Sequence, residues 1–294
     1  MHKFQLIQEA NVENTAVNKL THHKSRAFKP EKLTVPRDFQ LPRFVQQSIS
    51  QNSNQQQLSQ GSQSLPNDQD KQNNRRPLIV EIGAGKGRHA ILYAASHPQH
   101  DVIAIERTLN KFAAFESLVK AASSDPQASD FNNESKKLRQ LNLNNALGSD
   151  KQLNLDNLLP VHADAIPYCV YALPAQSVDA FYLLYPNPEP KNSNQQWLNM
   201  PFFEFLLSRL KPEGKVILAS NIEEYIDNAY QQAIDTWQLD TQRIQVATDS
   251  QRTHFEIKYL ARGETCWELN LTKPKGYVTR FDRWQAQLVY TFSE

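Results

Sequence analysis

The stretch Leu78-Ile-Val-Glu-Ile-Gly-Ala-Gly-Lys-Gly-Arg88 decides the fold of this 294-residue chain. Its apolar first half predicts a buried parallel strand, and the glycines Gly83, Gly85 and Gly87 predict a sharp turn into a helix. A dinucleotide-binding fingerprint needs a third glycine where Arg88 stands, and a P-loop needs Ser or Thr where Gly87 stands. Both of these motifs are therefore excluded, and the pattern that remains is Glu-x-Gly-x-Gly-x-Gly.

This pattern resembles motif I of the S-adenosylmethionine-dependent methyltransferases. The next apolar run ends in Glu106, which lies 25 positions after Glu81. That spacing is the length of one strand-helix-strand unit, and it places Glu106 to accept hydrogen bonds from the ribose hydroxyls of an adenosine-containing cofactor. The alternative is an acid that only caps the following helix. A third strand, residues 158–163, would end at Asp164 and place this carboxylate beside the adenine.

The rest of the chain continues the alternation of strands and helices. The sequence places Thr253 to Glu256 on a loop and a turn at residues 211–214. Hydrophobic periodicity predicts helices at residues 88–96, 111–120, 202–210 and 222–239, and strands at 178–185, 215–220, 243–247 and 266–271. Five crossover strands followed by an antiparallel pair predict an α/β fold, a seven-stranded Rossmann-like, mostly parallel sheet with helices on both faces, as in S-adenosylmethionine-dependent methyltransferases.

Composition divides the chain into three parts. Residues 1–43 form a basic N-terminal arm with eight Lys or Arg against four acids, either a phosphate-binding arm or a solvated tail. Residues 44–76 are a polar, low-complexity linker that cannot bury enough apolar surface to offset its chain entropy. The methyltransferase domain is expected at residues 77–294, with a polar insertion at about 122–156 that carries one short helix around residues 136–141.

Cysteine content and hydropathy exclude several classes of protein, whereas net charge does not. The formal net charge of +1 argues neither for nor against binding to nucleic acid. The only cysteines, Cys169 and Cys266, have no Cys-x-x-Cys spacing, so no metal site or disulfide framework is expected. Without a signal peptide or an apolar run of about 18 residues, the expectation is a cytoplasmic protein with no membrane contact.

Several further motifs together resemble the bacterial tRNA (guanine-N7)-methyltransferase family over about residues 77–272. The following motifs occur in this chain in the same order as in that family: Glu81-Ile-Gly, Glu106, Asp164-Ala165, Pro186-x-Pro188, Lys191, Ser220-Asn221 with Glu223 and Tyr225, Thr253-x-Phe-Glu256 and Gly263-x-x-x-Trp267-Glu-Leu. The last two motifs are specific to it. The resemblance implies S-adenosyl-L-methionine as cofactor and tRNA as partner.

The resemblance also assigns roles to individual residues. Glu81, Glu106 and Asp164 would hold the cofactor together with the loop of Gly83, Gly85 and Gly87. Position 187 would carry the active-site role and also touch the cofactor. Contacts to the nucleoside substrate would come from Lys191, Asn221, Thr253 and Glu256.

The chain departs from the family at the acceptor side. The family's Phe-Pro-Asp-Pro-Trp is Tyr185-Pro-Asn-Pro-Glu189, so its active-site Asp is Asn187, and a second family Asp is Asn221. The basic run that follows the family's lysine is the uncharged stretch 192–199. Since phosphate contacts dominate nucleic-acid affinity, positive charge for tRNA must come from elsewhere, for example the N-terminal arm.

Guanine N7 has an available lone pair, so its methylation needs alignment of donor and acceptor more than a strong base. The ring becomes cationic, and a nearby carboxylate, either Glu256 or Glu189, would favour the transition state. Three alternatives remain open. They are methylation of an exocyclic amine, a small-molecule acceptor, and a non-catalytic paralogue that binds the cofactor together with RNA or a protein.

Overall fold

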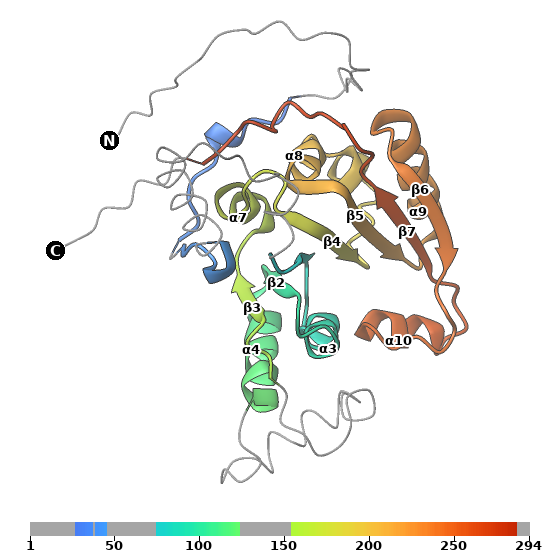
Figure 1. Cartoon of the computed structure of the whole chain (residues 1–294). Helices are drawn as coiled ribbons and strands as arrows, with labels where there is room; N and C mark the ends of the chain where they lie inside the picture. The colour runs from blue at the N-terminus through green and yellow to red at the C-terminus, as the bar shows by residue number, and fades with distance from the viewer. Residues whose placement is uncertain (1–26, 38, 46–74, 124–153, 287–294) are drawn as a thin grey trace, which may run out of the picture.

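The computed structural model describes residues 27–37, 39–45, 75–123 and 154–286, which are built around a seven-stranded sheet (Figure 1). The strand order is β3-β2-β1-β4-β5-β7-β6. The first five strands pair in parallel, and β7 runs antiparallel to both β5 and β6. The predicted fold of a mostly parallel, Rossmann-like sheet is therefore confirmed.

The central strands β1, β2 and β4 follow the apolar runs of the sequence, whereas the edge strand β6 is mostly polar. The strand bounds are β1 Leu78–Ile82, β2 Asp101–Glu106, β3 Leu158–His162, β4 Val178–Leu184, β5 Leu210–Ser220, β6 Asp240–Gln245 and β7 Trp267–Thr272. Every residue of β1 is buried, as expected for a central strand covered on both faces. The carboxyl ends of β1, β2, β4 and β5 meet at one edge of the sheet, where a doubly wound fold binds its ligands.

Helices cover both faces of the sheet. One face of the sheet is covered by α7 (Ala165–Ala172), α8 (Phe202–Arg209) and α9 (Glu223–Gln231). The opposite face is covered by α3 (Arg88–Ser96), α4 (Leu109–Ser123) and α10 (His254–Leu260). Figure 1 shows α10 next to α3. Short 3-10 turns lie at Pro30–Lys32, Ser193–Gln195 and Trp197–Asn199.

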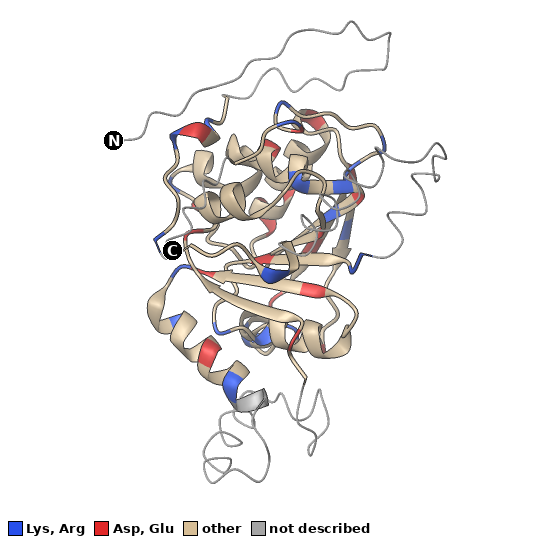
Figure 2. Ribbon diagram, turned by 60° about the vertical axis from the view of Figure 1, so that its left-hand side comes forward, with Lys and Arg blue, Asp and Glu red and all other residues tan. Residues whose placement is uncertain are grey.

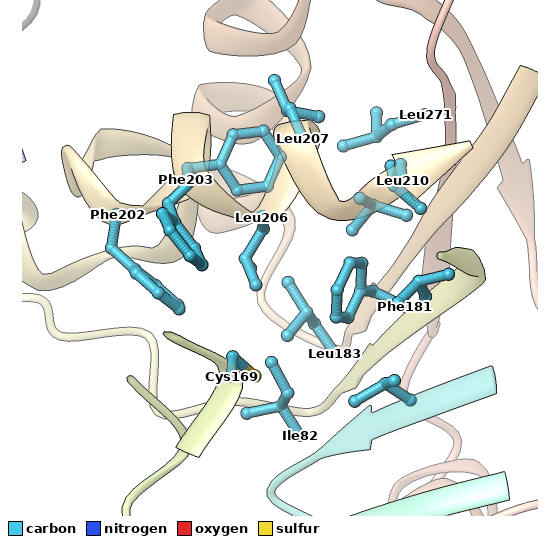
Figure 3. Packing of buried hydrophobic residues seen from close by; sticks show 14 of the residues in the cluster. Ile82, Cys169, Phe181, Leu183, Phe202, Phe203, Leu206, Leu207, Leu210 and Leu271 are labelled. Atoms are coloured by element: carbon cyan, nitrogen blue, oxygen red, sulfur yellow. The ribbon is translucent and has the colours of Figure 1, made fainter. Parts of the chain in front are cut away.

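The larger core lies under α8, whose residues are all buried. Figure 3 shows Leu206 of α8 beside Leu183 and Phe181 of β4, and these residues form one buried cluster with Phe202 and Phe203. Burying side chains of this size contributes about 1.5–3 kcal/mol each. This packing fixes β4 and therefore the position of the loop that follows it.

Three local predictions are corrected by the structure. Residues 211–214 form a bulge inside β5. Val178 of β4 pairs with Leu210 and Ala180 pairs with Lys215, so β5 advances by five residues where β4 advances by two. The expected helix 222–239 is α9 followed by a π-helical turn at Gln232–Thr236, and β6 begins at Asp240. Thr253 to Glu256 start the helix α10, and they are not a loop, because Thr253 caps its N-terminus.

Segments from both ends of the chain cover α8. Phe28 packs edge-on against Phe202 and Phe205, and Phe281 lies 5.7 Å from Phe205 between ring centroids. Arg209 is fully buried and donates to the carbonyl oxygens of Phe281 and Trp284. Burial lowers its pKa to about 10.

The described part of the chain contains no helix that is both long and apolar enough to cross a bilayer. Basic and acidic residues are mixed over its ribbon (Figure 2). The short helix expected around residues 136–141, most of the insertion, the beginning of the arm and most of the linker lie outside the described residues.

Candidate active site

The glycine loop after β1 leaves open space above two of its glycines. Gly83, Gly85 and Gly87 all have positive φ, between 61° and 80°, which L side chains rarely adopt. A Cβ added to Gly83 or Gly85 would meet nothing within 4 Å, whereas one on Gly87 would lie 1.9 Å from the ring of Phe115. A ligand can therefore lie against Gly83 and Gly85, and Gly87 is required by packing against α4.

Glu106 links the second strand to this loop. Its Oε2 accepts a hydrogen bond from the backbone N–H of Gly85 at 2.8 Å, and its Oε1 accepts one from Thr108 N at 2.6 Å. A carboxylate has about four lone-pair sites, so two remain for the hydroxyls of a ribose. The structure thus brings Glu106 against the loop, as its 25-residue spacing from Glu81 indicates.

Glu81 is buried and lies on the α3 side of β1. Its Oε2 is 3.0 Å from Nδ1 of His89, the second residue of α3, and both side chains are at most 8% exposed. The ring of His89 lies 4.7 Å from that of Tyr182 between centroids. This contact ties the start of α3 to β1, so one Glu81 oxygen already has a protein partner.

Asp164 is exposed at the start of α7. Its Oδ1 accepts from Ile166 N at 2.9 Å, which is a helix N-cap, and its second oxygen has no bond among those described. The preceding residue, Ala163, donates its N–H to the carbonyl oxygen of Glu106 at 3.3 Å. Asp164 therefore lies one residue beyond a backbone contact with Glu106.

The loop after β4 begins with a strained residue. Tyr185 has φ of +52°, and it is a bulky residue in a region that favours glycine. Asn187 is exposed and donates from Nδ2 to Oε1 of Glu189 at 2.7 Å. Gln196 donates from Nε2 to the carbonyl oxygen of Pro188 at 2.9 Å, which ties this loop to the segment before α8. A carboxylate thus sits beside position 187, and Lys191 is exposed farther along.

Asn221 lies directly after β5, next to the end of β4. Its Nδ2 donates to Oε2 of Glu264 at 2.7 Å, so a carboxylate accompanies this asparagine as well. Each asparagine that stands where the family has Asp is therefore hydrogen-bonded to a glutamate. In the sequence Glu189 is two positions from Asn187, whereas Glu264 is far from Asn221 and could not be paired with it.

Glu256 is the centre of a buried network at the start of α10. It is 0% exposed, and it accepts from Tyr185 Oη at 2.9 Å, Ser250 Oγ at 2.5 Å and Arg252 Nη2 at 2.8 Å. Arg252 also donates to Glu268 of β7 at 2.6 Å. Burial tends to raise the pKa of Glu256, but hydrogen bonds from Arg252 and Ser250 outweigh it, so the pKa is lowered.

Thr253 also turns inward, since it is buried and its Oγ1 accepts from Glu256 N at 2.9 Å. Among the residues that sequence reasoning missed are Arg252 and Ser250, which no motif marks. The tyrosine at position 185, where the family has Phe, is a signal that could have pointed to this network, although no prediction was based on it. Its hydroxyl is the group that reaches Glu256.

The segment before α10 also reaches the glycine loop. Arg88, the first residue of α3, donates from Nε to the carbonyl oxygen of Gln251 at 2.7 Å. The pKa of His254 is lowered by burial and by the positive charges of Arg88 and Lys86, so this ring is neutral at pH 7. Residues 250–256 therefore connect the loop after β1 with the loop after β4.

Comparison with known proteins agrees with this geometry. The model of a putative methyltransferase family matches residues 75–269. The tRNA (guanine-N(7)-)-methyltransferase of Nitrosospira multiformis is 24% identical over 205 residues, which are 68% of this chain and 76% of the relative. That of Roseobacter denitrificans is 26% identical over 159 residues, 53% of this chain and only 54% of the relative.

A solved 16S rRNA (adenine(1408)-N(1))-methyltransferase from Catenulisporales acidiphilia aligns with a TM-score of 0.45 and 15% identity, over 72% of this chain and 93% of that one. The family match covers more than half of the sequence, including the glycine loop, both strand-end loops and α10. The chain therefore belongs to this family of putative methyltransferases, enzymes that take their methyl group from S-adenosyl-L-methionine.

Proposed function

We propose that the protein transfers the methyl group of S-adenosyl-L-methionine to N7 of a guanine in tRNA. The observation that carries this proposal is the bridge formed by residues 250–256. It joins the loop beside Glu106 to the loop of Asn187, so a donor and an acceptor would meet above β1 and β4. The relatives named as tRNA (guanine-N(7)-)-methyltransferases support the choice of acceptor.

For the cofactor, open backbone at Gly83 and Gly85 would receive the methionine part, and Glu106 would accept from the ribose hydroxyls. Asp164 would accept from the adenine amino group. Glu81 would hold the start of α3 through His89 and so keep the loop in place. The cofactor supplies an activated methyl group on sulfur, and the chain supplies alignment and exclusion of water.

For the acceptor, we assign the charge that the family places at position 187 to Glu189. Asn187 donates to Glu189, so the amide is fixed with its carbonyl oxygen free to accept from a guanine edge. A half-buried carboxylate next to the ring would favour the positive charge that develops on methylation. Lys191 and Asn221 remain our candidates for contacts to the nucleoside.

Thr253 and Glu256 would act indirectly. Both side chains are buried and hydrogen-bonded within the protein, so they would position Tyr185 and the loop after it without touching the base. The full saturation of Glu256 makes it a poor partner for a cationic ring. We therefore transfer the charge-stabilising role considered for it to Glu189.

For tRNA, we propose that positive charge comes from the basic arm. Arg37 and Arg43 line a hollow of about 440 Å³ between residues 36–37 and 39–43 and the edge strand β3, together with His162 and Phe39. None of the described residues that line it is acidic. A polyanion lying there would gain phosphate contacts that the uncharged stretch 192–199 lacks. With tRNA as its substrate, we propose that the enzyme acts in the cytoplasm.

The direct test is nucleoside analysis of unmodified bulk tRNA after incubation with the protein and methyl-labelled cofactor. The expected product is 7-methylguanosine. A labelled exocyclic amine or a labelled small molecule would replace this function with one of the alternatives. Cofactor binding without transfer to any acceptor would identify a non-catalytic paralogue.

A further inference from the structure

The side chain of Phe255 is exposed where its neighbours in the sequence are buried. Thr253 is 8% exposed and Glu256 is 0% exposed, but Phe255 between them is 41% exposed. The first turn of α10 therefore presents one side chain of substantial size to the solvent, and that side chain is aromatic. The polar members of the same motif face the interior and cannot be reached by a ligand.

Phe255 is held rigidly by other rings. Its ring stacks on that of Tyr259 one turn later, with centroids 6.0 Å apart and planes 16° from parallel. It also lies 6.3 Å from the ring of Tyr185, and Tyr185 lies 5.9 Å from Tyr259. One face of Phe255 is therefore packed against protein, while the remaining surface is open. Such pre-ordered aromatics lose little conformational entropy when a flat ligand stacks on them.

Phe255 belongs to the segment 250–256, which contacts both of the loops where donor and acceptor are proposed to meet. Tyr185 immediately precedes Pro186 and Asn187, the acceptor loop. Toward the glycine loop, the carbonyl oxygen of Gln251 accepts a hydrogen bond from Arg88, and burial together with the charges of Arg88 and Lys86 lowers the pKa of His254. The exposed ring thus belongs to the segment that connects the two loops.

We propose that Phe255 is a stacking site for the acceptor base, a role that rests on the proposed function. Base–aromatic stacking strengthens binding by about five- to a hundredfold per base. A purine methylated at N7 is cationic, and a cation is attracted to the negative face of an aromatic ring. Phe255 would therefore bind the developing product more tightly than the neutral base, and it would raise the rate as well as the affinity.

Exposed apolar residues are common on protein surfaces and by themselves need no explanation. Val278 is 51% exposed, and no ring contact surrounds it in the described part of the chain. It provides a matched control, because truncating it removes a similar exposed apolar group away from both loops. The difference between the two positions separates a stacking site from an ordinary surface residue.

The experiment compares Phe255→Leu, Phe255→Tyr, Phe255→Trp and Val278→Ala in single-turnover transfer to unmodified tRNA, with cofactor affinity measured by calorimetry. Stacking predicts that Tyr and Trp keep transfer within about threefold, while Leu loses roughly tenfold or more in kcat/KM with a part of it in kcat. Cofactor affinity should stay the same throughout. If Leu performs as well as Phe, the role is only packing and the proposal is overturned.

A second readout separates this proposal from the assignment of tRNA. The indole of Phe255→Trp should be quenched by 7-methylguanosine 5′-monophosphate more strongly than by guanosine 5′-monophosphate, measured with S-adenosylhomocysteine present. The protein has four other tryptophans, so wild type provides the baseline. Selective quenching without transfer to tRNA would retain the stacking site and discard the tRNA substrate. Equal quenching in wild type and variant would discard the stacking site.

Discussion

The proposed cofactor side, after β1 and β2, and the proposed acceptor side, after β4 and β5, are built in different ways. Beside β1 and β2, Glu106 is held by backbone N–H groups of Gly85 and Thr108, so the site depends on chain geometry. Beside β4 and β5, the loop depends on side chains, because Tyr185 and Arg252 meet on the buried Glu256. A site held by backbone groups keeps its geometry when side chains change, whereas a site held by side chains changes its hydrogen bonds when those side chains are substituted. The departures from the family accordingly lie on the acceptor side.

Removing Arg252 should have the largest effect, because it breaks the buried network behind the loop after β4. Arg252→Ala leaves the carboxylate of Glu256 buried without its ionic partner, which typically costs 3 kcal/mol or more of stability. Because its side chain is one-third exposed and Tyr185 and Ser250 remain, we expect a loss of about 3 kcal/mol. Urea unfolding measures it, with Lys275→Ala, which removes an exposed ion pair with Glu213, as control. A loss below about 0.5 kcal/mol would contradict the importance of the network.

The pH dependence of stability should report the same carboxylate. The pKa of Glu256 is lower in the folded protein than in the unfolded chain, so the folded state binds fewer protons. Its contribution is therefore fully present above about pH 4.5 and is lost as the pH falls through the lower, folded pKa. In Glu256→Gln this part of the acid dependence should disappear. If the stability of Glu256→Gln depended on acid pH as that of wild type does, the pKa of Glu256 would not be lowered in the folded protein.

Glu106→Gln tests the cofactor side. An amide can accept from Thr108 or Gly85 but loses the charge-assisted bonds to the ribose, a loss of about 1.5–3 kcal/mol, or roughly tenfold to a hundredfold in affinity. Calorimetry with S-adenosyl-L-methionine measures it, and Asp164→Asn, at an exposed position, should weaken binding less. Equal affinities of wild type and Glu106→Gln would remove Glu106 from the site.

Glu189→Gln tests whether the carboxylate beside Asn187 replaces the family's aspartate. We expect single-turnover methyl transfer to fall about tenfold, corresponding to about 1.4 kcal/mol, since the loop is partly exposed to water. Asn187→Asp alone would place two carboxylates side by side and raise the pKa of one of them. The double variant Asn187→Asp with Glu189→Gln should therefore restore activity. Failure of the double variant to exceed Glu189→Gln would refute the exchange.

The smallest expected effect concerns the hollow beside β3. Replacing both Arg37 and Arg43 with Ala should remove about two phosphate contacts, which lowers the slope of log affinity for tRNA against log salt by about 1.5. Affinity for the cofactor should not change. Lys215→Ala, an exposed lysine on β5, is the control. An unchanged slope would mean that tRNA does not reach this hollow.

The sequence predicted the positions of β1, the glycine loop and β2 well because they are built from local signals. The glycine loop, the strand end at Glu106 and helix α3 lie where periodicity and spacing placed them, whereas β3 ends at His162 and Asp164 caps α7. The acceptor side depends on contacts between residues far apart in the chain. Neither the pairing of Asn221 with Glu264 nor that of Tyr185 with Glu256 follows from spacing. The inward direction of Glu256 depends on Thr253 starting a helix, which the Thr-x-x-Glu spacing of a capping box could have indicated.

The measurement that tests the central claim most directly is nucleoside mass spectrometry of tRNA methylated by wild type and by Phe255→Leu in a single turnover. A guanine-N7 enzyme with an aromatic acceptor site should yield 7-methylguanosine with wild type and roughly tenfold less with Phe255→Leu, at the same cofactor occupancy. A methyl group on any other nucleoside, or no transfer by a wild-type protein saturated with cofactor, would contradict the assignment.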